Sequence, residues 1–388
     1  MIVYGFLILG FIGALWWFNH ERQTRLNADP GQHHIEQNRG VLIAARHLLP
    51  LLGGVPAVWS TCLLFFQALL FIGYTYAHGL TRRSPAFQTR FHLSLLVFAT
   101  VQLGLRAAAG GSPLAPWPAD HFLAAAFDDS PALQAFAILA ATVGLPFFAL
   151  AATGPLLQAW HAQVRPRGFP YRLYALSNLG SLLALAAYPL LVEPALSLKT
   201  QGVAWSLGFA GLGGVLAFAA RELRTVRRLP SHDLVTEGGE PSPARISPAT
   251  FAFWCALAAV PSALLAATTQ QICLEVAAVP LLWALPLALY LATFVVCFAA
   301  RRPAPRLSWL LRFAGAATAA AIALAKGAEL DFGLQILAFS LALVAGSMIC
   351  HGELARSRPE PANLTTFYLA VALGGALGGA PGGALGGA

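Results

Sequence analysis

The sequence predicts an all-α integral membrane protein, a polytopic bundle of 11–12 transmembrane helices. Of its 388 residues, 57% are hydrophobic and only 10% are charged, and the mean hydropathy is +0.66. This balance would leave a water-soluble fold with too little polar surface. Two further observations support the prediction: apolar runs recur along the chain, and loops rich in arginine alternate with loops that lack it.

The apolar runs approach or reach the length of a membrane-spanning helix. A helix needs about 20 apolar residues to cross a hydrocarbon core of about 30 Å, because every backbone polar group must be bonded internally. Eleven such runs lie at residues 2–18, 57–79, 91–108, 133–152, 173–192, 202–220, 250–268, 279–299, 309–325, 332–351 and 364–380. We therefore expect at least eleven spans.

A twelfth span is one interpretation of residues 40–54, which are short for a crossing and contain Arg46, His47 and Pro50. If this segment crosses, Met1 lies outside and the arginines between residues 19 and 40 lie inside, as their charge favours. The alternative is a re-entrant or interfacial segment, which leaves these arginines in an external loop.

The distribution of arginine predicts the orientation. The loops at 80–90, 153–172, 221–249, 300–307 and 352–362 hold sixteen arginines, whereas the four loops between them hold two basic residues. Positive charge resists translocation, so the arginine-rich loops should lie on the cytoplasmic side. The membrane is expected to be the inner (plasma) membrane of the cell. The net charge of +8 is thus explained by topology, and we expect no nucleic-acid partner.

Composition also divides the chain. A polar segment rich in proline and glycine, residues 229–249, is predicted to be a cytoplasmic linker between a first membrane half (41–228) and a second (250–380). Residues 1–40 are predicted to form an atypical N-terminal anchor and polar loop. Residues 381–388 repeat GGALGGA after Pro381 and are expected to be a low-complexity tail.

Four ordered blocks carry a family resemblance. They are GGVPAVWSTCLLFFQALLFIGYTYAHGL (53–80), LYALSNLGSLLALAAYPLLVEP (173–194), VPLLWALPLALYLATFVVCFAARR (279–302) and ICHGELARSRPEPANLTTFYLAVALGGALGG (349–379). Together they resemble the membrane portion of the fused major facilitator/spermidine synthase family. The resemblance implies a major-facilitator-like bundle. Because this sequence has no counterpart of the family's aminopropyltransferase domain, we expect no enzymatic activity.

Ionisable side chains in apolar runs are candidate path residues, because each costs roughly 2.5 to 3.5 kcal/mol at the centre of a membrane helix. Arg46 and His47 need a partner or a water-filled cavity. Glu275, at an external helix end, is either a solvated carboxylate or part of a collar for a cationic substrate. His351 and Glu353, beside an arginine loop, are either an interfacial cap that pairs with Arg356 or Arg358, or a proton or amine gate.

Uncharged polar side chains deeper in the spans form the second group of candidates. Such groups either bond between helices, at about 0.6 kcal/mol apiece, or line a substrate path. The candidates are Gln67, Gln102, Asn178, Gln270 and Gln271.

Two functional hypotheses follow. In the first, the chain is a permease-like domain for a small metabolite, with cations among the candidates. In the second, it does not transport but holds a separately made aminopropyltransferase at the bilayer. The spans contain no catalytic constellation, and the five cysteines lack metal-ligand spacing, so we expect no catalytic residue, metal, cofactor or disulfide.

Overall fold

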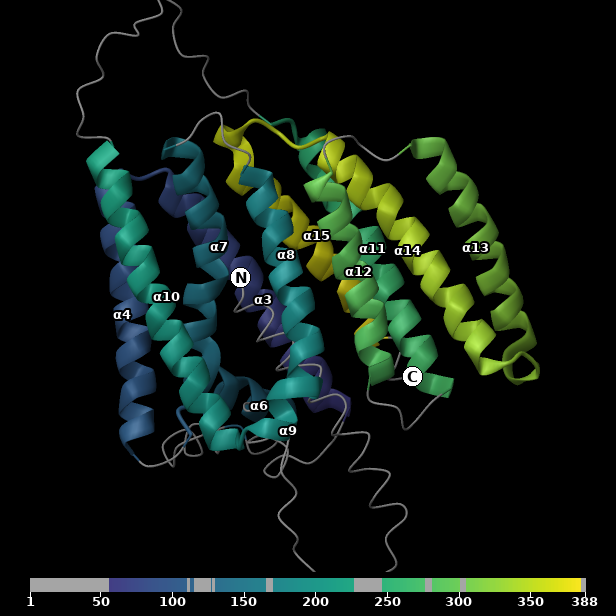
Figure 1. Cartoon of the computed structure of the whole chain (residues 1–388), viewed down its shortest axis with the longest axis horizontal. Coiled ribbons are helices and arrows are strands. Elements are labelled where there is room, and N and C mark those ends of the chain that lie inside the picture. Colours follow the sequence, from purple (N-terminus) through teal and green to yellow (C-terminus); the bar gives the residue numbers. More distant parts are fainter. Residues whose placement is uncertain are drawn as a thin grey trace, which may run out of the picture.

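The computed structural model describes residues 56–109, 112–114, 127, 130–164, 170–226, 246–275, 281–300 and 305–384. In these residues the regular structure is entirely helical, and the helices lie alongside one another in one bundle (Figure 1). Seven of the described helices are long and apolar enough to cross a membrane. The predicted helical bundle is therefore confirmed, and the chain is a multi-pass membrane protein.

The helices coincide with the predicted spans from residue 57 onward. The first half contains α3 (Pro56–Thr81), α4 (Pro85–Ala108), α6 (Pro131–Leu139), η1 (Ala140–Gly144), α7 (Leu145–Val164), α8 (Pro170–Ala187), η2 (Tyr188–Val192), α9 (Glu193–Ala195) and α10 (Leu198–Val226). The second half contains α11 (Pro248–Glu275), α12 (Leu281–Ala299), α13 (Arg306–Lys326), η3 (Gly327–Glu329), α14 (Phe332–Arg356), η4 (Pro361–Asn363) and α15 (Leu364–Ala384). The runs at 2–18 and 40–54 lie outside the described residues.

Local sequence explains where several helices begin. The side chains of Ser84, Ser130 and Asp331 accept hydrogen bonds from the backbone N–H three residues later, at 3.4, 3.4 and 3.2 Å. Proline follows both serines. Backbone N–H groups in the first helical turn have no carbonyl partner within the helix, so a proline, which lacks this group, is well tolerated there. These caps satisfy donors that the helix itself leaves unpaired.

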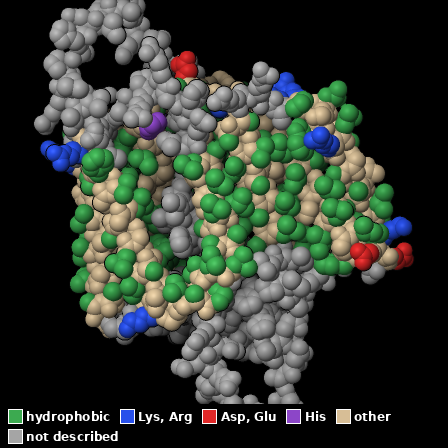
Figure 2. All heavy atoms as spheres, in the orientation of Figure 1, with side chains coloured by type: hydrophobic (Ala, Val, Ile, Leu, Met, Phe, Trp, Pro, Cys, Tyr) green, Lys and Arg blue, Asp and Glu red, His purple; other side chains and the backbone are tan. Residues whose placement is uncertain are grey.

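The outer surface of the bundle is apolar. Figure 2 shows hydrophobic side chains over the middle of the visible face, with Lys, Arg, Asp and Glu near its two rims. Leu183, Leu207 and Leu311 are 62%, 68% and 66% exposed. Exposed leucines at this density suit contact with lipid, where only helices that satisfy their own backbone groups can lie.

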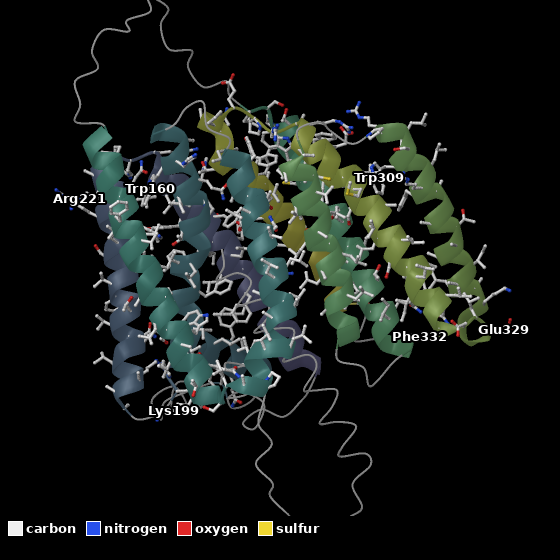
Figure 3. All side chains as sticks on the ribbon, viewed as in Figure 1. Trp160, Lys199, Arg221, Trp309, Glu329 and Phe332 are labelled. Atoms are coloured by element: carbon white, nitrogen blue, oxygen red, sulfur yellow. The ribbon has the colours of Figure 1, made fainter. Side chains whose placement is uncertain are left out.

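The loops alternate between the two ends of the bundle. Figure 3 places Arg221, Trp160 and Trp309 towards one end and Lys199, Glu329 and Phe332 towards the other. The arginine-rich and arginine-poor loops containing Arg221 and Lys199 are thus at opposite ends, as the sequence predicts. Which end faces the cytoplasm stays a prediction.

The glycine-rich end of the chain forms a helix that packs closely on α11. A Cβ added to Gly374 or Gly378 would collide with the carbonyl oxygen of Cys255 or Ala259, respectively. Glycines four residues apart let two membrane helices approach this closely. Because α15 continues to Ala384, the first residues of the expected low-complexity tail belong to the helix.

Candidate functional site

The two membrane halves meet along two pairs of helices near the middle of the bundle (Figure 1). Helix α8 packs on α12, and α3 packs on α15. Helix α14 packs in turn on α12 and α11. We call the following six residues of α8, α12, α14 and α15 the central seam: Tyr174, Asn178, Tyr290, Phe294, His351 and Tyr368.

Aromatic rings run through the central seam from one half to the other. Tyr368 of α15 stacks on Tyr174 of α8, with ring centroids 5.1 Å apart. Tyr174 meets Phe294 of α12 edge-on at 5.7 Å, and Phe294 stacks on the His351 ring of α14 at 3.6 Å. All four rings are buried, so these contacts connect the halves away from water and lipid.

His351 is fully buried and has one partnered ring nitrogen. Its Nδ1 lies 2.9 Å from Oγ1 of Thr293, whereas its Nε2 has no hydrogen-bond partner among the residues that the structure describes. Sequence reasoning expected water to reach this side chain at a helix end and offered pairing with Arg356 or Arg358. That expectation is wrong, because His351 faces α12 and is enclosed by the rings of Phe294 and Tyr290.

The partners assign the tautomer of His351. The hydroxyl of Thr293 donates its hydrogen to the carbonyl of Tyr290 at 2.7 Å, so its oxygen must accept from His351. Nδ1 therefore carries the hydrogen, and Nε2 presents an unshared lone pair. A buried acceptor without a partner costs about 1–3 kcal/mol, so its presence needs an explanation.

Further hydroxyl groups lie on α14 itself and on the helices that pack against it. One turn before His351 on α14, Ser347 is also fully buried, and its Oγ has no partner within the described part of the chain. The hydroxyl groups of Tyr290 and of Ser262 on α11 lie 3.4 Å apart. The described residues of α11, α12 and α14 thus include a histidine acceptor without a described partner together with several hydroxyl groups, a combination that can bind a proton or an N–H donor.

Asn178 and Gln67 lie on the two different helix pairs that join the halves. Asn178 is 8% exposed and donates from Nδ2 to the carbonyl of Tyr174 at 2.9 Å. The amide of Gln67 lies beside Gly379, where α3 packs on α15. The structure therefore brings Asn178 and His351 into one seam and places Gln67 on the second helix pair.

Gln102 lies elsewhere, between α4 and the π-helical turn η1. Its Nε2 donates to the carbonyl of Ala141 at 2.9 Å, and Nη2 of Arg106 donates to the same oxygen at 3.0 Å. Arg106 is only 5% exposed. Arg106 was not among the sequence-based candidates. It could have been, because it lies inside the apolar run 91–108, and ionisable residues in such runs were the ones selected.

Glu353 belongs to an ion cluster at the end of α14. Arg306 at the start of α13 bonds to it through Nε at 2.5 Å and through Nη2 at 2.6 Å, and Nη1 of Arg356 bonds to it as well. A cavity of about 80 Å³ adjoins these three side chains. The expected pairing with Arg356 is present, and Arg306 is an additional partner that the sequence did not suggest.

The remaining candidates are not part of the seam as described. Gln270 and Gln271 are partly buried near the end of α11. Arg46, His47 and the side chain of Glu275 lie outside the described residues.

His92, which follows the arginine loop at 80–90 in the sequence, is a second fully buried histidine. Its Nε2 lies 3.0 Å from Oγ1 of Thr153, and its Nδ1 lies 3.4 Å from the hydroxyl of Tyr76. Thr153 donates to the carbonyl of Ala149, so Nε2 of His92 is the donor and Nδ1 accepts from Tyr76. Both nitrogens of this second buried histidine are satisfied, in contrast to His351.

Comparison with known proteins adds no relative. The chain matches no protein-family model, and a search of curated proteins finds no match either.

Proposed function

We propose that the chain is a permease-like membrane domain that moves a small cationic metabolite across the bilayer. The observation that carries this proposal is the lone pair of His351 Nε2, which is buried, has no partner among the described residues, and belongs to a ring stacked on Phe294, the residue that contacts Tyr174 of the other half. Buried polar groups in membrane helices are costly and commonly mark proton or substrate pathways. An ammonium group or a transferred proton would supply the donor that this nitrogen lacks.

The contacts between helices support a major-facilitator-like arrangement. If residues 40–54 form the first crossing of the first membrane half, which follows the separate N-terminal anchor, α3 and α12 are the second helices of their halves, and α8 and α15 are the fifth. The second helix of each half then packs on the fifth helix of the other, through the pairs α3–α15 and α12–α8. The second helix also packs on the fourth in both halves, as α3–α7 and α12–α14.

This repeated pattern is what a two-fold relation between the halves would produce. Transporters built from repeats bind substrate near the bilayer midplane at the repeat interface and alternate access by rocking one repeat against the other. The seam lies at this interface. The four sequence blocks similar to the fused major facilitator/spermidine synthase family agree with such an arrangement, and we propose that relationship on their basis.

Transport can be tested with the purified chain in proteoliposomes and a panel of labelled polyamines and other small metabolites. His351→Gln removes the basic nitrogen and should lower uptake about tenfold, as expected when a charge-assisted hydrogen bond of at least about 1.4 kcal/mol is lost. His92→Gln is the matched control, because it changes an equally buried histidine whose nitrogens are both satisfied within the first half.

The outcomes separate the two functional hypotheses. Loss of uptake in His351→Gln, with uptake per folded molecule retained in His92→Gln, supports the permease. Equal uptake in the parent and both variants would remove His351 from the path. A parent that transports nothing but retains a bound aminopropyltransferase on purification would replace the permease with the scaffold.

A further inference from the structure

A cavity of about 480 Å³ opens where α3 ends, beside α7 and the start of α15. Its volume is within the range of about 300–1,000 Å³ that is usual for small-molecule sites. Alanines of α7 form one wall. The polar side chains of the lining are His78, Thr81, Arg82, Asn363, Thr365 and Thr366. No aspartate or glutamate is among the described residues that line it.

Hydrogen bonds fix the polarity of this lining. Nη2 of Arg82 lies 2.8 Å from Nε2 of His78, and Nδ1 of His78 lies 2.9 Å from Oγ1 of Thr365. Because a guanidinium group only donates, Nε2 must accept, and Nδ1 must carry the hydrogen that it gives to Thr365. His78 is therefore neutral, and among the described lining residues Arg82 carries the formal charge.

Donors remain available for a ligand. Arg82 has five N–H groups, of which His78 accepts one, and the Thr365 oxygen accepts from His78 while its own hydrogen stays free to be donated. Thr366 adds a second hydroxyl group. The N-terminal end of α15, which carries the positive end of the helix dipole, adjoins the cavity. It adds to the preference of Arg82 for a negatively charged ligand.

We propose that this cavity binds a phosphate-bearing anion. A guanidinium group with two hydroxyl donors, those of Thr365 and Thr366, in the same cavity matches the multiple acceptor oxygens and the charge of a phosphate group. The cavity lies at the end of the bundle where α3 gives way to the arginine loop, so both lipid headgroups and dissolved phosphates can reach it. The shared chemistry is the phosphate group, and the experiment distinguishes its source.

The test uses the purified full chain and its thermal unfolding midpoint. One arm titrates inorganic phosphate against chloride at equal ionic strength, and the other compares mixed micelles containing phosphatidylglycerol with micelles containing phosphatidylcholine. The midpoint of the parent should rise with phosphate, with phosphatidylglycerol, or with both. A response to lipid alone identifies a headgroup as the ligand, and a response to phosphate identifies a soluble one.

Variants at neighbouring arginines provide the control. Arg82→Gln should weaken apparent binding about tenfold, the loss expected for one charged hydrogen bond of about 1.4 kcal/mol. Arg83→Gln removes the same charge from the adjacent residue, which does not line the cavity, and should bind as the parent does. The apparent affinity of Arg82→Lys should lie between those of Arg82→Gln and Arg83→Gln, since lysine keeps the charge but lacks the forked N–H donors of arginine. An identical response of the parent, Arg82→Gln and Arg83→Gln, or a parent that responds to neither probe, overturns the proposal.

Discussion

The guanidinium of Arg106 donates a hydrogen bond to the backbone carbonyl of Ala141 on the neighbouring helix, with Nη2 and O 3.0 Å apart. This carbonyl lies in the π-helical turn Ala140–Gly144, shortly before Pro146. Proline has no N–H to offer the carbonyl of the preceding turn, so an outside donor is required. Gln102 and Arg106 of α4 each donate a hydrogen bond to this carbonyl. The π-helical turn is thereby joined to the neighbouring helix α4.

Loss of both donors to Ala141 should destabilise the fold by more than the sum of the single losses. Gln102→Leu and Arg106→Leu each leave the other donor in place, whereas the double variant leaves the carbonyl unpaired, at about 1–3 kcal/mol. Unfolding midpoints of the purified protein in detergent, measured as a double-mutant cycle, provide the check. Strict additivity would show that the two side chains do not share this role.

The close approach of α15 to α11 should make Gly378 intolerant of a methyl group. Gly378→Ala would press a Cβ against the carbonyl oxygen of Ala259, and overpacking of this kind costs about 1–3 kcal/mol. Gly375→Ala is the matched control, because its Cβ would meet Ser262 Oγ at an ordinary 3.6 Å. The yield of monodisperse protein and its unfolding midpoint should fall for the first variant alone. Equal behaviour of both would argue against the helix contact.

The linker at 229–249 should be cytoplasmic, because it belongs to the arginine-rich set of loops. A cysteine introduced as Ser242→Cys, in a background in which the native cysteines are replaced, should react with an impermeant maleimide only after the membrane is permeabilised. Labelling in intact cells would invert the orientation of the whole chain.

Residues 40–54 should cross the membrane and place Met1 outside. The sequence argument is the otherwise misplaced Arg22, Arg25 and Arg39. The helix contacts give a second argument: α11 packs on α12, α14 and α15, and a two-fold relation between the halves requires a counterpart of α11 before α3. A reporter active only in the cytoplasm should work when inserted near Gln32 and fail when fused before Met1. The reverse pattern contradicts the twelve-span topology.

Features of this fold that depend on local sequence could be predicted, and features that depend on contacts between distant residues could not. Membrane spans are predictable because lipid imposes a length and a composition on each helix separately, which is why the runs from residue 57 onward coincide with helices. The alternation of the loop ends follows from the same local rule. Even the pairing of Glu353 with Arg356 is local, since the two residues lie one helical turn apart.

The seam was less predictable because it depends on contacts between distant parts of the chain. The position of His351 near the end of its apolar run predicted an interfacial side chain. The side chain is buried because it packs against α12, whose Thr293 and Phe294 lie more than fifty residues earlier in the sequence. The tyrosines of the seam gave no signal, since aromatic residues are common throughout membrane helices. The glycines that pack on α11, Gly374 and Gly378, lie within the predicted span 364–380, but their close contacts depend on the shape of α11, which the sequence of the span does not contain.

Neutralising Glu353 should have little effect on stability and on uptake. The carboxylate holds Arg306 and Arg356, but the side chain of Arg306 is 67% exposed, and ion pairs of this kind contribute about 0–1 kcal/mol. Glu353→Gln should therefore shift the unfolding free energy by less than about 1 kcal/mol and leave uptake in proteoliposomes close to that of the parent. Glu360→Gln, which changes an exposed carboxyl beyond the end of α14, is the control for loss of one negative charge at this end of the bundle. A several-fold loss of uptake in Glu353→Gln alone, with the unfolding midpoint unchanged, would instead make Glu353 the gate that the sequence offered as one of its two interpretations.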